Sequence, residues 1–388
     1  MNRLRDTTTF DSRIYEASVA DMRARRERVH DLGEQVLRET GQIHPNVDIR
    51  GKMRVSHNAM VPNDTGDGTS VLANGIAWPL VSFFDGTCSM GGNVAKAHAA
   101  AGAIDAMLSR IRDAGANTQL AAGVVQDVVD HYPVVQMTQY ESDNRRVEQL
   151  RLLLPAMGGG DAIEDYDLAL AYMMLGLDLN IWQYGLKGYA FIVADEIGRG
   201  IVRPRDVQQH LGHVLQSQMT TQAICQKLLS KLHLFYLQVG NASRRDVSQW
   251  WNGNLGRGRT IQVPNPNLLA EAQAGLVYVT EVLEPTQEGL REFLLAEGAN
   301  KRISQQDTSK IWQWLQQAVD HFSAQAQLIR TNGPLPRPGD VFRHYRDAWP
   351  IGHPREHENN PVLETTDQAE GTNAAPKPTG SSIDWEKF

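Results

Sequence analysis

Residues 79–92 read Pro79-Leu-Val-Ser-Phe-Phe-Asp85-Gly-Thr87-Cys-Ser89-Met-Gly-Gly. An apolar run of strand length ends at Asp85, and hydroxyl side chains follow at Thr87 and Ser89. The small residues of the next turn lead into an Ala-rich stretch that predicts a helix. One carboxylate and two hydroxyls around a turn are hard oxygen donors, which suit Mg²⁺ or Mn²⁺. This stretch therefore predicts a strand, a metal-binding turn and a helix.

Two later segments carry acids in similar positions. Gly158-Gly-Gly-Asp161-Ala-Ile-Glu164-Asp165 is a glycine-rich loop that opens a predicted helix, and the apolar run Gly188–Ala194 ends at Asp195. From Trp78 onward, strand and helix patterns alternate, which predicts a mostly parallel sheet. Ligand sites in such sheets lie beyond the carboxyl ends of the strands. We therefore expect Asp85 and Asp195 to lie close together.

These residues resemble the von Willebrand factor type A (VWA) domain and its metal-ion-dependent adhesion site, over residues 76–285. Asp85, Thr87 and Ser89 match the family's first-loop Asp-x-Ser-x-Ser, with Thr in place of the first Ser. Asp195 matches the third-loop Asp. Asp161 stands in the second loop, where the family usually has a Thr, and this variant is similar to intracellular members such as alpha-kinase-associated A domains.

The expected fold class is α/β. The resemblance and the alternating pattern imply a doubly wound, mostly parallel six-stranded sheet with helices on both faces, VWA-like or Rossmann-like, with helical extensions at both ends. Strands are expected at Leu80–Phe84, within residues 134–142 and 145–149, and at residues 189–194, 233–239 and 259–263. The helix after the first strand is expected to run to about Ala114. The expected organisation is a helix and turn-rich extension (1–75), the VWA-like domain (76–285), two helices (286–332) and a disordered tail (333–388).

The resemblance implies a protein-binding module that is not an enzyme. Thr87 and Ser89 would contact Mg²⁺ or Mn²⁺ directly, Asp85 and Asp195 would hold the ion partly through waters, and Asp161 is a candidate second-loop ligand. A partner protein would complete the coordination with an acidic side chain. Bacterial intracellular relatives often work beside an AAA+ ATPase, which the resemblance permits.

Simpler interpretations of the same residues remain open. A strand-end Asp such as Asp85 often caps the following turn, and Asp195 could be a solvated loop acid. Asp161 and Glu164 have the spacing of a capping box at a helix start. Residues 383–388, Ile-Asp-Trp-Glu-Lys-Phe, could form a short docking motif at the end of an otherwise polar, proline-rich stretch.

Two other function classes are alternatives to the binding module. A metal-dependent phosphoester hydrolase would need a general base and a phosphate cradle, and neither can be placed from the sequence. An RNA-associated VWA protein is disfavoured by the net charge of −7, although Arg23–Arg28 and Arg244–Arg245 could form local basic patches.

Composition favours a cytoplasmic protein without a membrane segment. The chain of 388 residues is 41% hydrophobic, which is sufficient for a large core. It starts without the apolar segment of a signal peptide, and no run approaches the length that spans a bilayer. Its two cysteines, Cys88 and Cys225, provide no disulfide framework.

Overall fold

The computed structural model describes residues 31–353, apart from residues 98–99, 101–103, 105–107, 109–115, 131, 144, 157, 159–162, 241–243, 296–302, 324–334 and 345. The basic cluster at residues 23–28, Asp161 and the residues beyond 353 lie outside this part of the chain.

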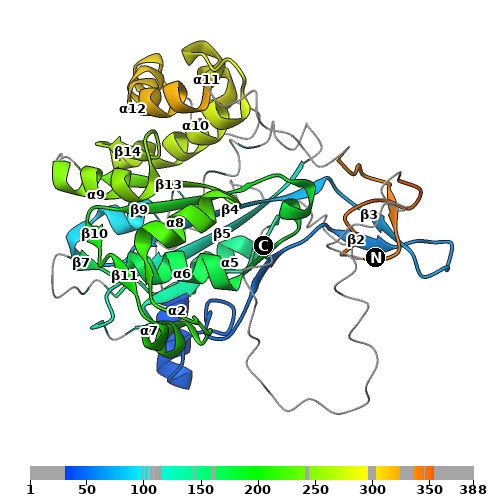
Figure 1. Ribbon diagram of the computed structural model, residues 1–388, viewed down its shortest axis with the longest axis horizontal. Helices are drawn as coiled ribbons and strands as arrows, with labels where there is room; N and C mark the ends of the chain where they lie inside the picture. Colours follow the sequence, from blue (N-terminus) through cyan, green and yellow to red (C-terminus); the bar gives the residue numbers. More distant parts are fainter. Residues whose placement is uncertain are drawn as a thin grey trace.

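The main sheet has six strands in the order β14-β13-β9-β4-β5-β6 (Figure 1). Their bounds are β4 Ile76–Asp85, β5 Ala116–Val125, β6 Val135–Met137, β9 Gly188–Ala194, β13 Leu232–Val239 and β14 Thr260–Val263. The pairs from β14 to β5 are parallel, whereas β6 runs antiparallel to β5. Only residues 126–134 connect β5 to β6, which is too short for the crossover that a parallel pair needs.

The expected fold class is therefore wrong in its simple form. The sheet is mixed, and strands outside it form four further small sheets in the described part of the chain. These pair β1 (Arg54–Ser56) with β8 (Leu177–Leu179), β7 (Ile163–Glu164) with β10 (Ile197–Gly198), and β11 (Ile201–Val202) with β12 (Met219–Thr220). The fourth joins β2 (Met60–Pro62), β3 (Ser70–Leu72) and β15 (Val341–Phe342). The flanking segments are thus not simply helical extensions of a doubly wound sheet.

The prediction for the second strand of the main sheet, in chain order, is also wrong. The sequence pattern put it within residues 134–142, but the long neighbour of β4 is β5, and only β6 lies in that range. Residues 145–149, expected as an edge strand, belong to helix α5 (Arg145–Leu150). The sequence of β5, Ala-Asn-Thr-Gln-Leu-Ala-Ala-Gly-Val-Val, carries few residues that favour strands. All ten of its residues are nevertheless buried, so its neighbours rather than its propensity hold it in the sheet.

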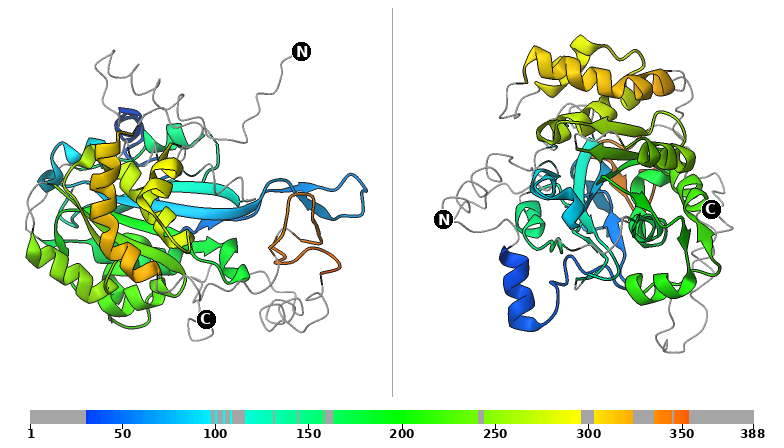
Figure 2. Two further views of the ribbon diagram at one scale, coloured as in Figure 1. Left: turned by 90° about the horizontal axis from the view of Figure 1, so that it is seen from above. Right: turned by 90° about the vertical axis from the view of Figure 1, so that its left-hand side faces the viewer.

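Helices cover both faces of the main sheet (Figures 1 and 2). One core packs α10 (Leu269–Glu281), α11 (Gln287–Leu294) and α12 (Gln305–Ser323) against residues such as Phe191 and Phe235. The other core packs α6 (Tyr166–Gly176), α7 (Pro204–Leu211), α8 (Thr221–Leu229) and α9 (Arg245–Leu255) against residues such as Ile192 and Tyr236. Neighbouring residues along a strand face opposite cores, as the period of two requires.

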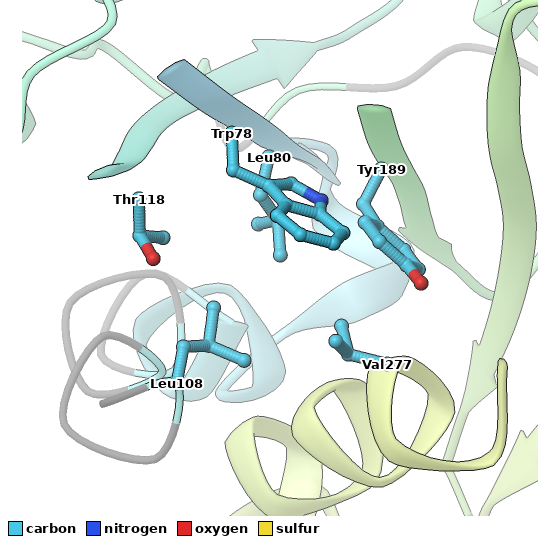
Figure 3. A pocket seen from close by; sticks show the side chains of 6 residues that line it. All are labelled: Trp78, Leu80, Leu108, Thr118, Tyr189 and Val277. Carbon is cyan, nitrogen blue, oxygen red and sulfur yellow. The ribbon is translucent and has the colours of Figure 1, made fainter. Parts of the chain in front are cut away.

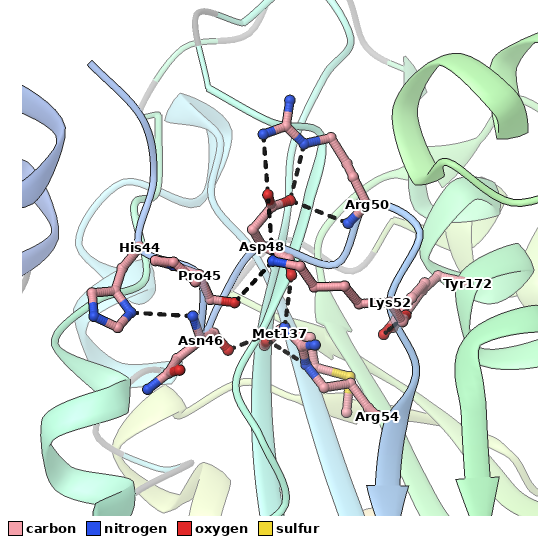
Figure 4. A network of polar contacts seen from close by, with 9 residues as sticks. All are labelled: His44, Pro45, Asn46, Asp48, Arg50, Lys52, Arg54, Met137 and Tyr172. Atoms are coloured by element: carbon pink, nitrogen blue, oxygen red, sulfur yellow. Dashed lines mark hydrogen bonds and ion pairs between the residues drawn. The ribbon is translucent and has the colours of Figure 1, made fainter. Parts of the chain in front are cut away.

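The segment before β1 is held against β6 by one buried arginine (Figure 4). Arg54 is 1% exposed, and its guanidinium donates to the carbonyl oxygens of Asn46, Asp48, Met137 and Thr138 at 2.8–3.1 Å. This segment follows helix α2 (Asp31–Thr40). The arginine thus closes the edge of the sheet with side-chain hydrogen bonds.

Strands β2, β3 and β15 form an arm that extends away from the helices (Figures 1 and 2). Strand β15 lies within the residues that the sequence analysis assigned to the tail, and it pairs with β3. The described residues include no helix that is both long enough and apolar enough to cross a bilayer.

Candidate metal site

Strands β4 and β9 are neighbours in the sheet and place Asp85 and Asp195 at the same edge. Asp85 is the last residue of β4, and Asp195 directly follows β9. The short helix η1 (Cys88–Met90) begins after Thr87, so the chain turns sharply and keeps Thr87 and Ser89 at this edge. The structure thus brings together four of the five predicted site residues.

A continuous row of polar contacts joins these four side chains. Asp85 Oδ1 accepts hydrogen bonds from the Thr87 backbone N–H at 2.7 Å and from Thr87 Oγ1 at 2.6 Å. Thr87 Oγ1 lies 3.2 Å from Ser89 Oγ, and Ser89 Oγ donates to Asp195 Oδ1 at 3.0 Å. Asp85 Oδ2 accepts from the hydroxyl of Tyr166, the first residue of α6, at 2.5 Å. Both oxygens of Asp85 are therefore engaged by the protein.

The row runs from the core to the surface. Asp85 and Thr87 are fully buried, Asp195 is half-buried and Ser89 is exposed. Burial raises the pKa of Asp85 to about 6, although hydrogen bonds from Thr87 and Tyr166 act in the opposite direction. Burial also raises the pKa of Asp195, while the hydrogen bond from Ser89 lowers it. The carboxylates of Asp85 and Asp195 thus lie together at this sheet edge, where burial disfavours their charged forms.

Glu164 is an additional member of this cluster that the sequence analysis did not select as a ligand. It lies in β7, is 1% exposed, and its Oε2 has no hydrogen-bond partner among the described residues. Burial, followed by the negative charges of Asp85 and Asp127, raises its pKa to about 8. Its place in the second of the three acidic loops is its sequence signal, and Asp161 shares that signal.

Asp161, the predicted second-loop ligand, lies outside the described residues. The capping-box interpretation of Asp161 with Glu164 is wrong, because Glu164 is in a strand and α6 begins only at Tyr166. Asp165 precedes α6 but makes no side-chain capping bond.

The surroundings of Glu164 contain a second set of buried acids bridged by one arginine. Arg199 donates to Asp127 Oδ1 at 3.0 Å and to Asp165 Oδ1 at 2.8 Å. The other oxygen of Asp127 is buried without a partner in the described structure, whereas Asp165 Oδ2 accepts from the Val128 backbone N–H at 2.9 Å. One guanidinium thus faces two carboxylates, with Glu164 next to one of them in sequence.

The donor set fits a hard divalent cation of the type expected. Within the described residues, no group of three or more His, Cys, Asp or Glu side chains is placed to hold a metal ion by itself. The cluster instead combines hydroxyls with carboxylates, and Glu164 leaves a buried oxygen free of hydrogen bonds. Oxygen donors of this kind match Mg²⁺ or Mn²⁺ rather than zinc.

A pocket at the opposite end of β4 does not compete with this site (Figure 3). It lies between the sheet and α10, among Trp78, Leu80, Leu108, Thr118, Tyr189 and Val277. Its cavity volume is about 10 Å³, which is at the lower limit for one water molecule. It cannot admit an organic ligand in this form.

No protein-family model matches the chain, and no curated protein matches it. Among solved structures, proximal thread matrix protein 1 from the mussel byssus is 9% identical with a TM-score of 0.34, and the match covers 52% of this chain and 47% of that one. The pilus adhesin SpaC from Lactobacillus rhamnosus GG, in its open conformation, is 9% identical with a TM-score of 0.35. That match covers 61% of this chain and 34% of the adhesin. The matches thus span less than half of the mussel protein and less than half of the adhesin, and their TM-scores are too low to carry an argument about fold or function.

Proposed function

We propose that the chain is a metal-dependent protein-binding module, with a divalent cation held at the edge formed by β4 and β9. The observation that carries this proposal is the contact between the two hydroxyls. If Thr87 gives its only hydroxyl proton to Asp85 and Ser89 gives its own to Asp195, their oxygens face each other at 3.2 Å with lone pairs alone. A cation beside the two oxygens would stabilise that arrangement.

Each side chain has a distinct role in this proposal. Thr87 and Ser89 would offer lone pairs to the ion, and Glu164 would offer its unpaired carboxylate oxygen. Asp85 and Asp195 would orient the hydroxyls by accepting their protons, since Asp85 already uses both oxygens within the protein. Few carboxylates would then contact the ion directly, so that its charge is only partly neutralised.

Bound Mg²⁺ or Mn²⁺ would supply an open coordination position that a carboxylate from another protein can take. The proposed partner is therefore a protein with an exposed Asp or Glu, either in a multiprotein assembly or on an AAA+ ATPase. A cytoplasmic location belongs to the same proposal and is supported by the two cysteines, Cys88 and Cys225, which are both free.

Calorimetric titration of the full chain with Mn²⁺ tests the metal site. We expect one ion to bind, and Thr87→Val to lower the affinity at least tenfold. Thr221→Val is the matched control, because Thr221 also donates its hydroxyl to a buried carboxylate, that of Asp167, and neither residue is a proposed ligand. If the parent chain binds no Mn²⁺ at millimolar concentration, or if both variants lose it equally, the proposal is wrong.

A pull-down from a native extract, with Mg²⁺ or with EDTA, tests the binding function. We expect a protein partner only with Mg²⁺. The same preparation can be assayed on a generic phosphodiester and for a salt-dependent RNA shift. Turnover or RNA binding would favour the hydrolase or the RNA-associated alternative instead.

A further inference from the structure

Three exposed apolar side chains lie beside the candidate metal site and form what we call the apolar rim: Val128, Val129 and Ile163. They are 38%, 66% and 38% exposed, respectively. The backbone N–H of Val128 is bonded to Asp165, and Ile163 directly precedes Glu164. The apolar rim therefore shares its loops with the acids of the site.

The charge around the apolar rim sets a condition on anything that binds there. The carboxylates of Asp85, Asp127 and Asp195 give this edge negative charge. Arg199 neutralises part of it through its bonds to Asp127 and Asp165. An acidic ligand would be repelled by this edge without a cation and attracted once a cation is bound. The matching ligand carries a carboxylate directly beside a large apolar side chain, and it binds only in the presence of the metal.

Residues 383–388 of this chain have that chemistry. In Ile383-Asp384-Trp385-Glu386, each acid has a large apolar residue on at least one side. The 29 residues that separate this segment from His353 can extend over about 100 Å. A compact chain of this length has a radius of gyration of about 21 Å, so the segment can reach any point on its own surface. The link also raises the effective concentration of the segment at the site.

We propose that residues 383–388 bind the metal-loaded site of their own chain, with a carboxylate of Asp384 or Glu386 facing the ion and Trp385 on the apolar rim. This inference rests on the proposed function. It makes the segment an internal competitor of the partner protein. A partner then gains access either by a stronger acidic contact or when the segment is withdrawn.

A fluorescein-labelled peptide of residues 381–388 tests the inference by fluorescence anisotropy against the full chain. We expect the variant carrying Asp384→Asn and Glu386→Gln to bind the peptide at least fivefold more tightly than the parent in Mg²⁺, because its own segment no longer competes. In EDTA neither chain should bind. A peptide with the same two substitutions should not bind either chain.

A substitution on the apolar rim separates this contact from the metal site. In the double variant, Val129→Ser should weaken peptide binding at least fivefold and leave the Mn²⁺ affinity unchanged. Val214→Ser is the matched control, since Val214 is 43% exposed outside the apolar rim. Equal loss of peptide binding in both variants would exclude the apolar rim as the contact.

The outcomes also separate this inference from the proposed function. If Mn²⁺ binds but the peptide does not, the inference is wrong and the metal-dependent module stands. If Mn²⁺ does not bind at all, both are wrong. If the parent forms a Mg²⁺-dependent dimer that the double variant does not form, the segment binds a second copy, which contradicts binding within one chain.

Discussion

Asp85 serves two physical purposes, and they can be separated by substitution. Its carboxylate is a charge at the edge of the sheet, and it is also the hydrogen-bond acceptor for Thr87 and for the buried hydroxyl of Tyr166. Alanine at position 85 would remove both, and it would leave the hydroxyl of Tyr166 buried without its acceptor.

We therefore expect Asp85→Ala to lower the free energy of unfolding by about 1–3 kcal/mol and to abolish Mn²⁺ binding. Asp85→Asn keeps the side-chain shape and one acceptor oxygen, so the loss of stability should be smaller. Because it removes the negative charge, it should lower Mn²⁺ affinity at least tenfold. Urea unfolding in EDTA and calorimetry with Mn²⁺ measure both quantities. An asparagine variant with parental Mn²⁺ affinity would show that Asp85 is only structural.

Glu164 provides a second test at the same scale. Burial and the charges of Asp85 and Asp127 disfavour its ionised form, so Glu164→Gln should stabilise the metal-free protein by about 1 kcal/mol at pH 8 or above. The same change should weaken Mn²⁺ binding. Relative to the parent, the melting temperature of Glu164→Gln should therefore rise in EDTA and fall in Mn²⁺. A change of the same sign in both conditions would show that Glu164 does not belong to the site.

The residues of the candidate site could be predicted from sequence only in part. Asp85, Thr87, Ser89 and Asp195 come together because two apolar runs end in acids and neighbouring parallel strands share an edge. Glu164 could not be selected over Asp161, because spacing alone places both on the same glycine-rich loop. Their assignment as metal ligands stays a prediction.

At the scale of single elements, β5 shows why local patterns were insufficient. Gly123 lies opposite Phe83 in the paired strand, and a Cβ at this glycine would come within 2.2 Å of the Phe83 ring. The glycine weakens the strand signal in the sequence but is required by the close packing of β5 against β4. Such a requirement depends on the tertiary partner and cannot be read from residues 116–125 alone.

The connection between β1 and the sheet edge depends on Arg54. Replacing it with methionine would remove a donor from the carbonyl oxygens of residues 46, 48, 137 and 138, and the bonds to residues 137 and 138 are buried. We expect Arg54→Met to lower the free energy of unfolding by about 3 kcal/mol. Arg50→Met is the matched control, because Arg50 is half exposed and its partner is the nearby Asp48 (Figure 4). Similar losses in both variants would contradict the role given to Arg54.

At the scale of the whole molecule, the helices after residue 285 share a core with the sheet. The ring of Phe322 in α12 lies 5.6 Å from that of Phe235 in β13, in a tilted contact. Gly275 of α10 lies so close to Leu315 of α12 that a Cβ at this glycine would come within 2.6 Å of the leucine side chain. Leu315, Phe322 and Phe235 belong to one buried cluster. We therefore expect the sheet and these helices to unfold together.

His233 is a titratable group at this junction. Its ring stacks on Tyr189 and meets the edge of Phe322, and its Nδ1 is buried without a hydrogen-bond partner in the described structure. Burial, together with the positive charges of Lys187 and Arg259, lowers its pKa to about 3. The folded protein thus keeps this imidazole neutral. In the unfolded chain, the same imidazole takes up a proton below the ordinary histidine pKa of about 6.5.

Acidification should therefore destabilise the junction through His233. The pKa of His233 is depressed in the folded protein, so its contribution to the unfolding free energy is fully present above pH 6.5. That contribution is lost as the pH falls toward 3, by up to about 1.4 kcal/mol per pH unit. His233→Phe keeps an aromatic ring in the stack and removes the proton, so its unfolding free energy should fall less steeply between pH 6.5 and pH 4.5. Urea titrations of the parent, His233→Phe and the partly exposed control His210→Gln measure these slopes. Since all three proteins have the same carboxylates, the difference in slope isolates His233. Parallel slopes would show that acid unfolding begins elsewhere.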